Sequence, residues 1–289
     1  MLNSNLTGFM GCDASYEEAE IVLFGAPFDS TASFRPGTRF ASRAMREASF
    51  GLETYSPYLD ADLEDCAVFD AGDPELCIGD STLALAEIER VSREIFQDGK
   101  LPVLLGGEHL VTLGVVREAI KKYPNLNIIH FDAHTDLRED YLGARLSHAT
   151  VLRRCWDLLG DGRIRQFGIR SGLKEEFEWA KEHTSMHRFN FDGLEETVRS
   201  LSGQPVYFTV DLDVMDPSIF PGTGTPEPGG VSFLELMAAM RTVAQGCNLI
   251  GCDLVELSPA LDQSGVSTVV ACKLLRELLL ELSNKKKPE

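Results

Sequence analysis

The sequence lacks several features that would mark whole classes of protein. It has no apolar run long enough to span a bilayer, no N-terminal secretion signal and no internal repeat. Its seven cysteines are scattered, odd in number and without a CxxC pair, which favours reduced thiols over disulfides. Basic residues are scarce, 27 against 45 acidic, and a net charge of −18 would repel nucleic-acid phosphates. We therefore expect a cytoplasmic protein that binds neither nucleic acid nor a membrane.

What the sequence does contain is an alternation of apolar segments and helical patterns. Its 289 residues, 44% hydrophobic, suit one large α/β domain over residues 1–289. Strands are predicted within residues 20–29, 101–107, 125–134, 164–171, 204–214 and 248–259. Helices are predicted within residues 35–52, 81–100, 110–123, 174–183, 231–244 and 267–284. Nearly continuous apolar strands that alternate with helices indicate a mostly parallel sheet, covered by helices on both faces.

Acidic and imidazole side chains follow four of the predicted strands. They are Glu108 and His109; Asp132, His134 and Asp136; Asp211, Asp213 and Asp216; and Glu256. Ligands of such sheets bind at the carboxyl ends of the strands, so these groups are expected at one edge. Any one of them alone could be a helix cap or a loop residue, but four strand ends together indicate a shared site.

Half-buried carboxylates that gather at one place repel each other and lose hydration, and a bound dication removes both costs. Two imidazoles with several carboxylates and no thiolate form a hard ligand set that favours Mn(II), although Fe, Co, Ni and Zn stay open. The number of ligands suffices for two ions roughly 3.5 Å apart, which would generate a hydroxide nucleophile at neutral pH.

The motifs "GGEH" (106–109), "DAHTD" (132–136), "SHAT" (147–150), "DLDVMDP" (211–217) and "PGTGTPEPGG" (221–230) occur in this order. Together they resemble the ureohydrolases, which include arginases and agmatinases. The stretches "RPGTRF" (35–40) and "GIRSGLKEEFEWAK" (168–181) are similar to agmatinases rather than arginases. The resemblance implies a three-layer α/β/α fold of the arginase/deacetylase type, with a central sheet of about eight strands. It also implies two Mn(II) ions and a homo-oligomer, a trimer or a hexamer.

The resemblance also implies roles for single residues. The first ion would take His109, Asp132, Asp136 and Asp211, and the second His134, Asp132, Asp211 and Asp213. Asp136 would orient the nucleophile, Glu256 would hold the guanidinium group, and His148 would relay a proton to the leaving amine. Two positions depart from the common family pattern, Glu108 and Ala149. We expect little effect from Glu108, whereas Ala149 bears on the position of His148.

The substrate is expected to be a small cationic guanidino compound. Arginases hold the amino-acid end of arginine with an asparagine two residues beyond the DxHxD motif, where this sequence has Arg138. Agmatine is therefore favoured, giving urea and putrescine, with Asp140, Glu175 or Glu176 as candidate acceptors for its amine. The alternatives are 4-guanidinobutyrate, whose carboxylate Arg138 would serve, formiminoglutamate, and a metal-binding protein without turnover.

Overall fold

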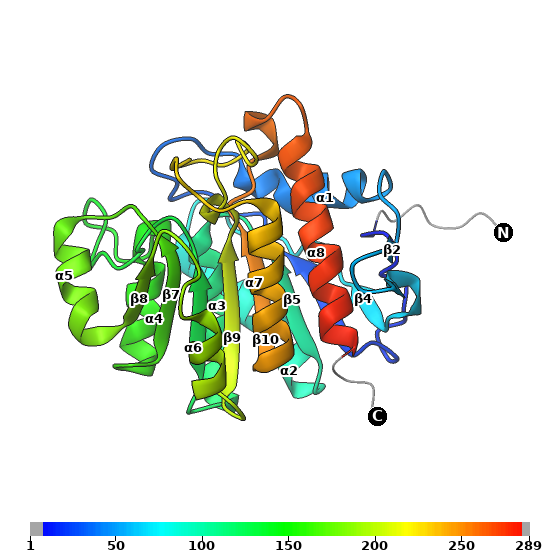
Figure 1. Cartoon of the computed structure of the whole chain (residues 1–289), viewed down its shortest axis with the longest axis horizontal. Helices are drawn as coiled ribbons and strands as arrows, with labels where there is room; N and C mark the ends of the chain where they lie inside the picture. Colours follow the sequence, from blue (N-terminus) through cyan, green and yellow to red (C-terminus); the bar gives the residue numbers. More distant parts are fainter. Residues whose placement is uncertain (1–7, 285–289) are drawn as a thin grey trace.

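The computed structural model describes residues 8–284, which are built around one eight-stranded sheet (Figure 1). Its strand order is β4-β1-β5-β10-β9-β6-β7-β8, and every neighbouring pair is parallel. The strands are β1 (Ile21–Gly25), β4 (Val68–Asp70), β5 (Leu101–Leu105), β6 (Asn127–Phe131), β7 (Ile164–Ile169), β8 (Ser185–Arg188), β9 (Pro205–Asp211) and β10 (Asn248–Val255). A small hairpin consists of β2 (Tyr55–Ser56) and β3 (Ala61–Asp62).

Helices cover both faces of the sheet, which makes three layers. The α-helices are α1 (Ala41–Ser49), α2 (Ser81–Gln97), α3 (Thr112–Lys122), α4 (Val151–Leu159), α5 (Lys174–His183), α6 (Leu194–Ser200), α7 (Phe233–Gly246) and α8 (Val266–Asn284). The 3₁₀ helices are η1 (Thr38–Phe40), η2 (Leu63–Asp65), η3 (His109–Val111), η4 (His148–Thr150), η5 (Leu212–Val214) and η6 (Pro259–Leu261). One face carries α1, α6, α7 and α8, and the other carries α2, α3, α4 and α5.

Strand β9 shows why the sheet needs two covering layers. All seven of its residues are buried, and consecutive side chains point to opposite faces of a strand. Phe208 therefore belongs to the core under α7 and α8, while its neighbour Tyr207 belongs to the core under α2, α3 and α4. A strand buried on both faces has the unbroken apolar pattern from which the parallel sheet was predicted.

The predicted fold class is confirmed, with two strands more than the apolar pattern alone indicated. The additional strands β4 and β8 form the two edges of the sheet. They are three and four residues long, and the β8 sequence "SMHR" is partly exposed, so neither produces an apolar run. Among residues 8–284, no helix combines the length and the apolar character needed to cross a membrane.

Local signals fix where the covering helices begin. The Asp80 carboxylate accepts hydrogen bonds from the amides of Thr82 and Leu83 at the start of α2. Ser232 and Glu235 form a reciprocal capping box at the start of α7.

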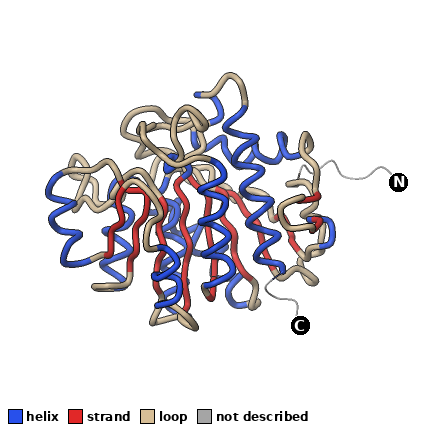
Figure 2. The backbone as a smooth tube through the Cα atoms, in the orientation of Figure 1, coloured by secondary structure: helices blue, strands red, loops and turns tan. Residues whose placement is uncertain are grey.

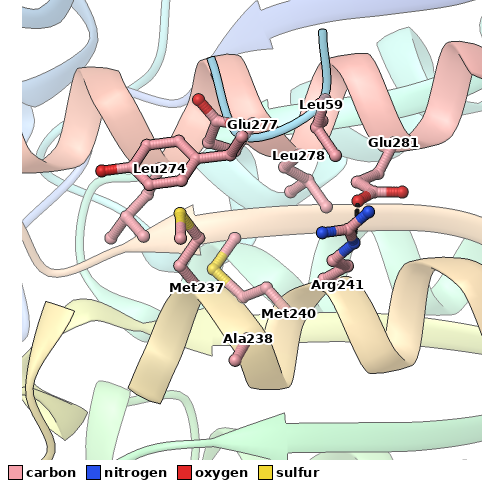
Figure 3. Close-up of a pocket in the computed structure, with 10 residues that line it drawn as sticks. Leu59, Met237, Ala238, Met240, Arg241, Leu274, Glu277, Leu278 and Glu281 are labelled. Atoms are coloured by element: carbon pink, nitrogen blue, oxygen red, sulfur yellow. Dashed lines mark ion pairs between the residues drawn. The ribbon is translucent and has the colours of Figure 1, made fainter. Parts of the chain in front are cut away.

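A mainly apolar pocket lies between α7 and α8 (Figure 3). Met237 and Met240 of α7 face Leu274 and Leu278 of α8, and Arg241 pairs with Glu281 at 2.9 Å. No histidine lines the pocket, and its two acids, Glu277 and Glu281, are paired with Arg276 and Arg241, so it is not the site predicted from the strand ends.

Candidate metal centre

The connecting loops gather at the carboxyl edge of the sheet (Figure 2), and most of the predicted site residues lie at these strand ends. Asp216 does not join them, because its carboxylate accepts the amide hydrogens of Ser218, Gly229 and Gly230. Asp211 is the last residue of β9, while Asp132 and Glu256 directly follow β6 and β10. His109 begins η3, four residues after the end of β5. These strands, β5, β10, β9 and β6, are consecutive neighbours in the sheet, so their ends converge.

The glycine pair before His109 allows this convergence. A Cβ atom on Gly107 would lie 2.0 Å from the carbonyl oxygen of Phe28, and one on Gly106 would lie 2.6 Å from Cα of Val255. Residues 106 and 107 therefore fit between the loop after β1 and the end of β10 only because both positions lack a side chain.

His109 lies at the centre of a first group of carboxylates. Its Nδ1 atom is 3.1 Å from Oδ2 of Asp132, 3.2 Å from Oδ2 of Asp136 and 3.4 Å from Oδ2 of Asp211. All four side chains are buried. This is the set that the resemblance to the ureohydrolases implied for the first metal ion.

His134 lies at the centre of a second group. Its Nδ1 atom is 3.0 Å from Oδ2 of Asp213 and 3.4 Å from Oδ1 of Asp132. Asp132 therefore turns one oxygen to His109 and the other to His134, as a carboxylate shared by two ions would. Asp211 faces His109 with Oδ2, while its Oδ1 accepts the amide hydrogen of Asp213.

The residues fit a divalent metal. Nδ1 of His109 is a buried nitrogen without a hydrogen-bond partner, although three carboxylate oxygens surround it. Burial and the neighbouring carboxylates raise the pKa of Asp136 to about 7 and the pKa of Asp211 well above its ordinary value. These pKa values are raised because no sufficient positive charge faces the carboxyl groups. A bound dication would supply that charge and favour the ionised carboxylates.

Two of the site residues adopt a backbone conformation that costs energy. Asp136 has φ 52° and Glu256 has φ 67°, both in the left-handed region that residues with a side chain rarely adopt. The carbonyl of Asp136 accepts the amide hydrogens of Leu152 and Arg153, which holds this turn in place. Such strain is common at functional sites.

Glu256 is buried beside the metal ligands. Its Oε1 atom accepts the amide hydrogen of His109 at 2.8 Å, and the side chain lines the same pocket as Asp211 and His148. Burial and the charge of Glu108 raise the pKa of Glu256 well above its ordinary value. A guanidinium cation in the pocket would stabilise this carboxylate.

His148 lies across the pocket, in η4. Its Nε2 atom is 3.1 Å from Oγ of Ser33, and its Nδ1 atom is 3.2 Å from Oγ of Ser147. Burial, together with the charges of His134, His109 and Arg138, lowers the pKa of His148 to about 4. The imidazole is therefore neutral at pH 7 and can accept a proton before it passes one on.

His130 was not predicted, although it is part of the centre. Its Nε2 atom is 2.8 Å from Oδ2 of Asp132, and its Nδ1 atom is 3.1 Å from the amide nitrogen of Gln166. That amide nitrogen also donates to the carbonyl of Thr135, while the amide oxygen accepts from Thr184. Nδ1 of His130 therefore accepts and Nε2 donates to Asp132, which leaves no nitrogen free for a metal. The alternation noticed from Asp132 onward, extended back by one step, would have revealed this residue.

Comparison with known proteins identifies the family. A family model described as the arginase family matches residues 19–281. The chain is 49% identical to an agmatinase of Bacillus anthracis over 276 residues, 94% of this chain and 95% of that protein. It is 34% identical to a guanidinobutyrase of Pseudomonas aeruginosa over 282 residues, 93% of this chain and 88% of that protein.

The chain belongs to the arginase family. It also resembles the crystal structure of an agmatine ureohydrolase of Thermoplasma volcanium, with a TM-score of 0.87, 35% identity and coverage of 96% and 94% of the two chains. The chain is therefore an enzyme of the ureohydrolase type, whose family binds divalent metal and whose described residues include a His/Asp cluster that suits such an ion.

The three candidate acceptors for the far end of the substrate differ in their surroundings in this ureohydrolase. Glu176 is buried, and its oxygens accept from the Thr135 hydroxyl and from the amides of Leu137 and Leu173. Both of its oxygens are therefore engaged in holding the loops that form the pocket wall. Asp140 and Glu175 are exposed and lie outside the pocket that contains His148.

Arg138 lines the pocket of the ureohydrolase, as the position after the motif suggested. Its guanidinium carbon is 4.9 Å from the centre of the Tyr141 ring, and its Nε atom is 3.7 Å from Oε2 of Glu176. The cation is thus stacked on an aromatic ring and partly balanced by one carboxylate.

Glu108 has a larger role than the sequence suggested. It is fully buried, and burial raises its pKa to about 7. Its carboxylate accepts from the hydroxyl and the amide of Thr31. The hydroxyl oxygen of Thr31 in turn accepts the amide hydrogen of His148 at 3.0 Å. Glu108 therefore anchors the loop on which the position of His148 depends.

Replacing Glu108 with alanine is expected to lower kcat by about 10–100-fold, the usual loss when the support of a site residue is removed. KM should change little, because Glu108 does not line the pocket. Steady-state urea release and the metal content of the purified variant measure this effect. Glu108→Asp, which keeps the charge, should retain most of the activity. A Glu108→Ala enzyme with wild-type kcat would show that the anchor is dispensable.

Proposed function

We propose that the ureohydrolase hydrolyses agmatine to urea and putrescine at a pair of Mn(II) ions. The observation that carries the proposal is the division of Asp132 between two imidazoles, with Oδ2 toward His109 and Oδ1 toward His134. One carboxylate that faces two nitrogen ligands suits two ions side by side. When bound, the ions balance the buried carboxylates and make a water-derived nucleophile available at neutral pH.

Three residues of the chain would act on the substrate directly. Glu256 would bind the planar guanidinium through its carboxylate, and Asp136 would accept a hydrogen bond from the attacking water and orient it. His148, neutral at pH 7, would accept a proton from the water-derived nucleophile and donate it to the leaving amine. Addition of water to the guanidinium carbon and loss of the amine balance as agmatine plus water giving urea plus putrescine.

The metal ligands in this proposal are those of the motif match. The first ion would take His109, Asp132, Asp136 and Asp211, and the second would take His134, Asp132, Asp211 and Asp213. The two groups of short distances described above support the first set, and His134, Asp132 and Asp213 of the second. The place of Asp211 in the second set rests on the motif match alone, because its Oδ1 accepts the amide hydrogen of Asp213. The hard, oxygen-rich ligand set favours manganese among the divalent metals.

Agmatine is preferred over arginine for two reasons. Proteins named agmatinase are nearly half identical to this chain along almost all of its length. In addition, Arg138 stands at the position where arginases have the asparagine that holds the amino-acid end of arginine, so that contact is absent from this pocket.

One observation favours a second candidate, 4-guanidinobutyrate. Arg138 is a cation on the pocket wall, and a carboxylate at the far end of the substrate would pair with it. Agmatine instead brings an ammonium group, whereas the carboxylates that line the pocket hold the loops or are assigned to the metal and the guanidinium.

A parallel assay tests the proposal. Mn(II)-loaded protein is incubated with agmatine, 4-guanidinobutyrate, arginine and formiminoglutamate, and urea is measured for the first three and formamide for the fourth, with Asp132→Ala as the inactive control. We expect kcat/KM for agmatine to exceed the others by more than about tenfold, which corresponds to about 1.4 kcal/mol. A preference for 4-guanidinobutyrate that Arg138→Met removes would contradict the substrate and leave the metal centre intact.

A further inference from the structure

A buried chain of hydrogen bonds runs behind His109, on the side away from the carboxylates. Nε2 of His109 is 2.9 Å from Oγ1 of Thr209. The Thr209 hydroxyl donates to Oδ1 of Asp253 at 2.6 Å. All three residues are buried, and Asp253 belongs to none of the motifs that predicted the site.

The sheet itself builds this chain. Thr209 of β9 and Asp253 of β10 are directly paired in the parallel register of the two strands. Tyr207, two residues before Thr209, points to the same face and donates its hydroxyl to Oδ2 of Asp253 at 2.7 Å. Thr112 of α3 donates to the same oxygen at 2.9 Å. Burial raises the pKa of Asp253, and the charge of His109 and the three hydroxyl donors oppose this by stabilising the ionised carboxylate.

The number of hydrogens fixes the direction of the chain. The Thr209 hydroxyl has one hydrogen, and an ionised Asp253 can only accept it. The hydroxyl oxygen of Thr209 must then accept from His109, so the hydrogen of the neutral imidazole is on Nε2. Nδ1 is left without a hydrogen, and this is the atom that points at Asp132, Asp136 and Asp211.

We propose that Asp253 is a positioning residue that, through Thr209, holds His109 in the tautomer able to bind the first metal ion. The inference rests on the proposed function, because it assigns His109 as a metal ligand. The opposite tautomer would direct an N–H group at the ion and could not bind it. The ring also cannot turn away without giving up its bond to Thr209.

The test compares two variants that each remove one hydroxyl donor from the same carboxylate. Thr209→Val breaks the link between Asp253 and His109, whereas Tyr207→Phe removes a donor that does not contact His109. Both should lower the Tm of the metal-free protein to a similar extent. Mn(II) binding to chelator-treated protein is then measured by calorimetry.

We expect Thr209→Val to weaken the binding of one Mn(II) ion by about 10–100-fold. Tyr207→Phe should change it by less than about threefold, and Thr209→Ser, which restores the hydroxyl, should recover the wild-type affinity. Equal losses in Thr209→Val and Tyr207→Phe, or no recovery in Thr209→Ser, would overturn the proposal. If the two variants differ in Mn(II) affinity as expected but the wild-type protein releases no urea from agmatine, only the proposed substrate is contradicted.

Discussion

Asp211→Asn is expected to reduce urea release by more than about 100-fold, because even the loss of an outer partner of a metal ligand can cost that much. Asp211 is buried, and its Oδ2 atom is 3.4 Å from Nδ1 of His109. The asparagine amide has the same shape but no charge, so it cannot bridge two cations. Urea release and metal content, measured on the same preparation, check this result.

The same substitution should stabilise the protein when metal is absent. Burial and the charges of Asp213 and Asp132 raise the pKa of Asp211, so its ionised form is unfavourable without a cation. The Tm of metal-free Asp211→Asn should therefore exceed that of the metal-free wild type. Asp216→Asn is the matched control. The Asp216 carboxylate accepts the amide hydrogens of Ser218 and Gly229, so its substitution should lower the Tm while metal stays bound. An Asp211→Asn enzyme that kept both metal ions would contradict the ligand assignment.

Removal of the metal is expected to make stability fall as the pH rises from 6.5 to 8. The pKa values of Asp136 and Glu108 are raised to about 7, and those of Asp211 and Glu256 are also raised, with burial as the first cause in each case. In the unfolded chain these acids lose their protons near pH 4, so the folded protein binds more protons above that pH. Stability therefore decreases as the pH rises through the folded pKa values, by on the order of 1 kcal/mol or more.

The histidines decide which pH window to use. Burial acts to lower the pKa of His109 and His134, but the facing carboxylates outweigh it and raise both pKa values. The stability that these two histidines contribute is therefore also lost as the pH rises. Burial lowers the pKa of His130, and lowers that of His148 to about 4, which makes stability increase with pH up to about 6.5. Above pH 6.5 this opposing effect fades, because the unfolded histidines also lose their protons, and the fall caused by the buried acids dominates. Thermal unfolding of chelator-treated protein at both pH values measures it.

The metal-loaded protein is the control for this experiment. Its ligands must be deprotonated, so metal binds more tightly at the higher pH and adds stability by mass action. Its Tm should therefore rise, or stay level, between pH 6.5 and 8. Parallel falls of Tm in the loaded and metal-free forms would show that the buried carboxylates do not control stability.

The central part of the fold was predictable because its strands are buried on both faces. Strands β5, β6, β9 and β10 are nearly continuous apolar segments, and helices separate them along the chain. The edge strands β4 and β8 and the short helix α6 carry too few apolar residues to produce such a pattern. Their existence follows from pairing with a sheet that is already formed.

The positions of the site residues were predictable, but the conformation that brings them together was not. The alternation of Asp132, His134 and Asp136 suggested an extended strand, whereas β6 ends at Phe131 and Asp136 lies in a left-handed turn. His130 continues the same alternation one step back and could have been found from it. The roles of Glu108 and Asp253, in contrast, depend on contacts between distant segments, which no local pattern records. The residue roles in catalysis, the single domain over residues 1–289, the trimer or hexamer and the cytoplasmic location stay predictions.

One measurement tests the central claim most directly, namely that the two groups of ligands hold two metal ions. Crystals of the Mn(II)-loaded enzyme are measured at the manganese absorption edge, and the anomalous peaks are located. We predict two peaks, one beside Nδ1 of His109 and one beside Nδ1 of His134, with Asp132 in contact with both. A single peak, or a peak bound by His130, would contradict the account.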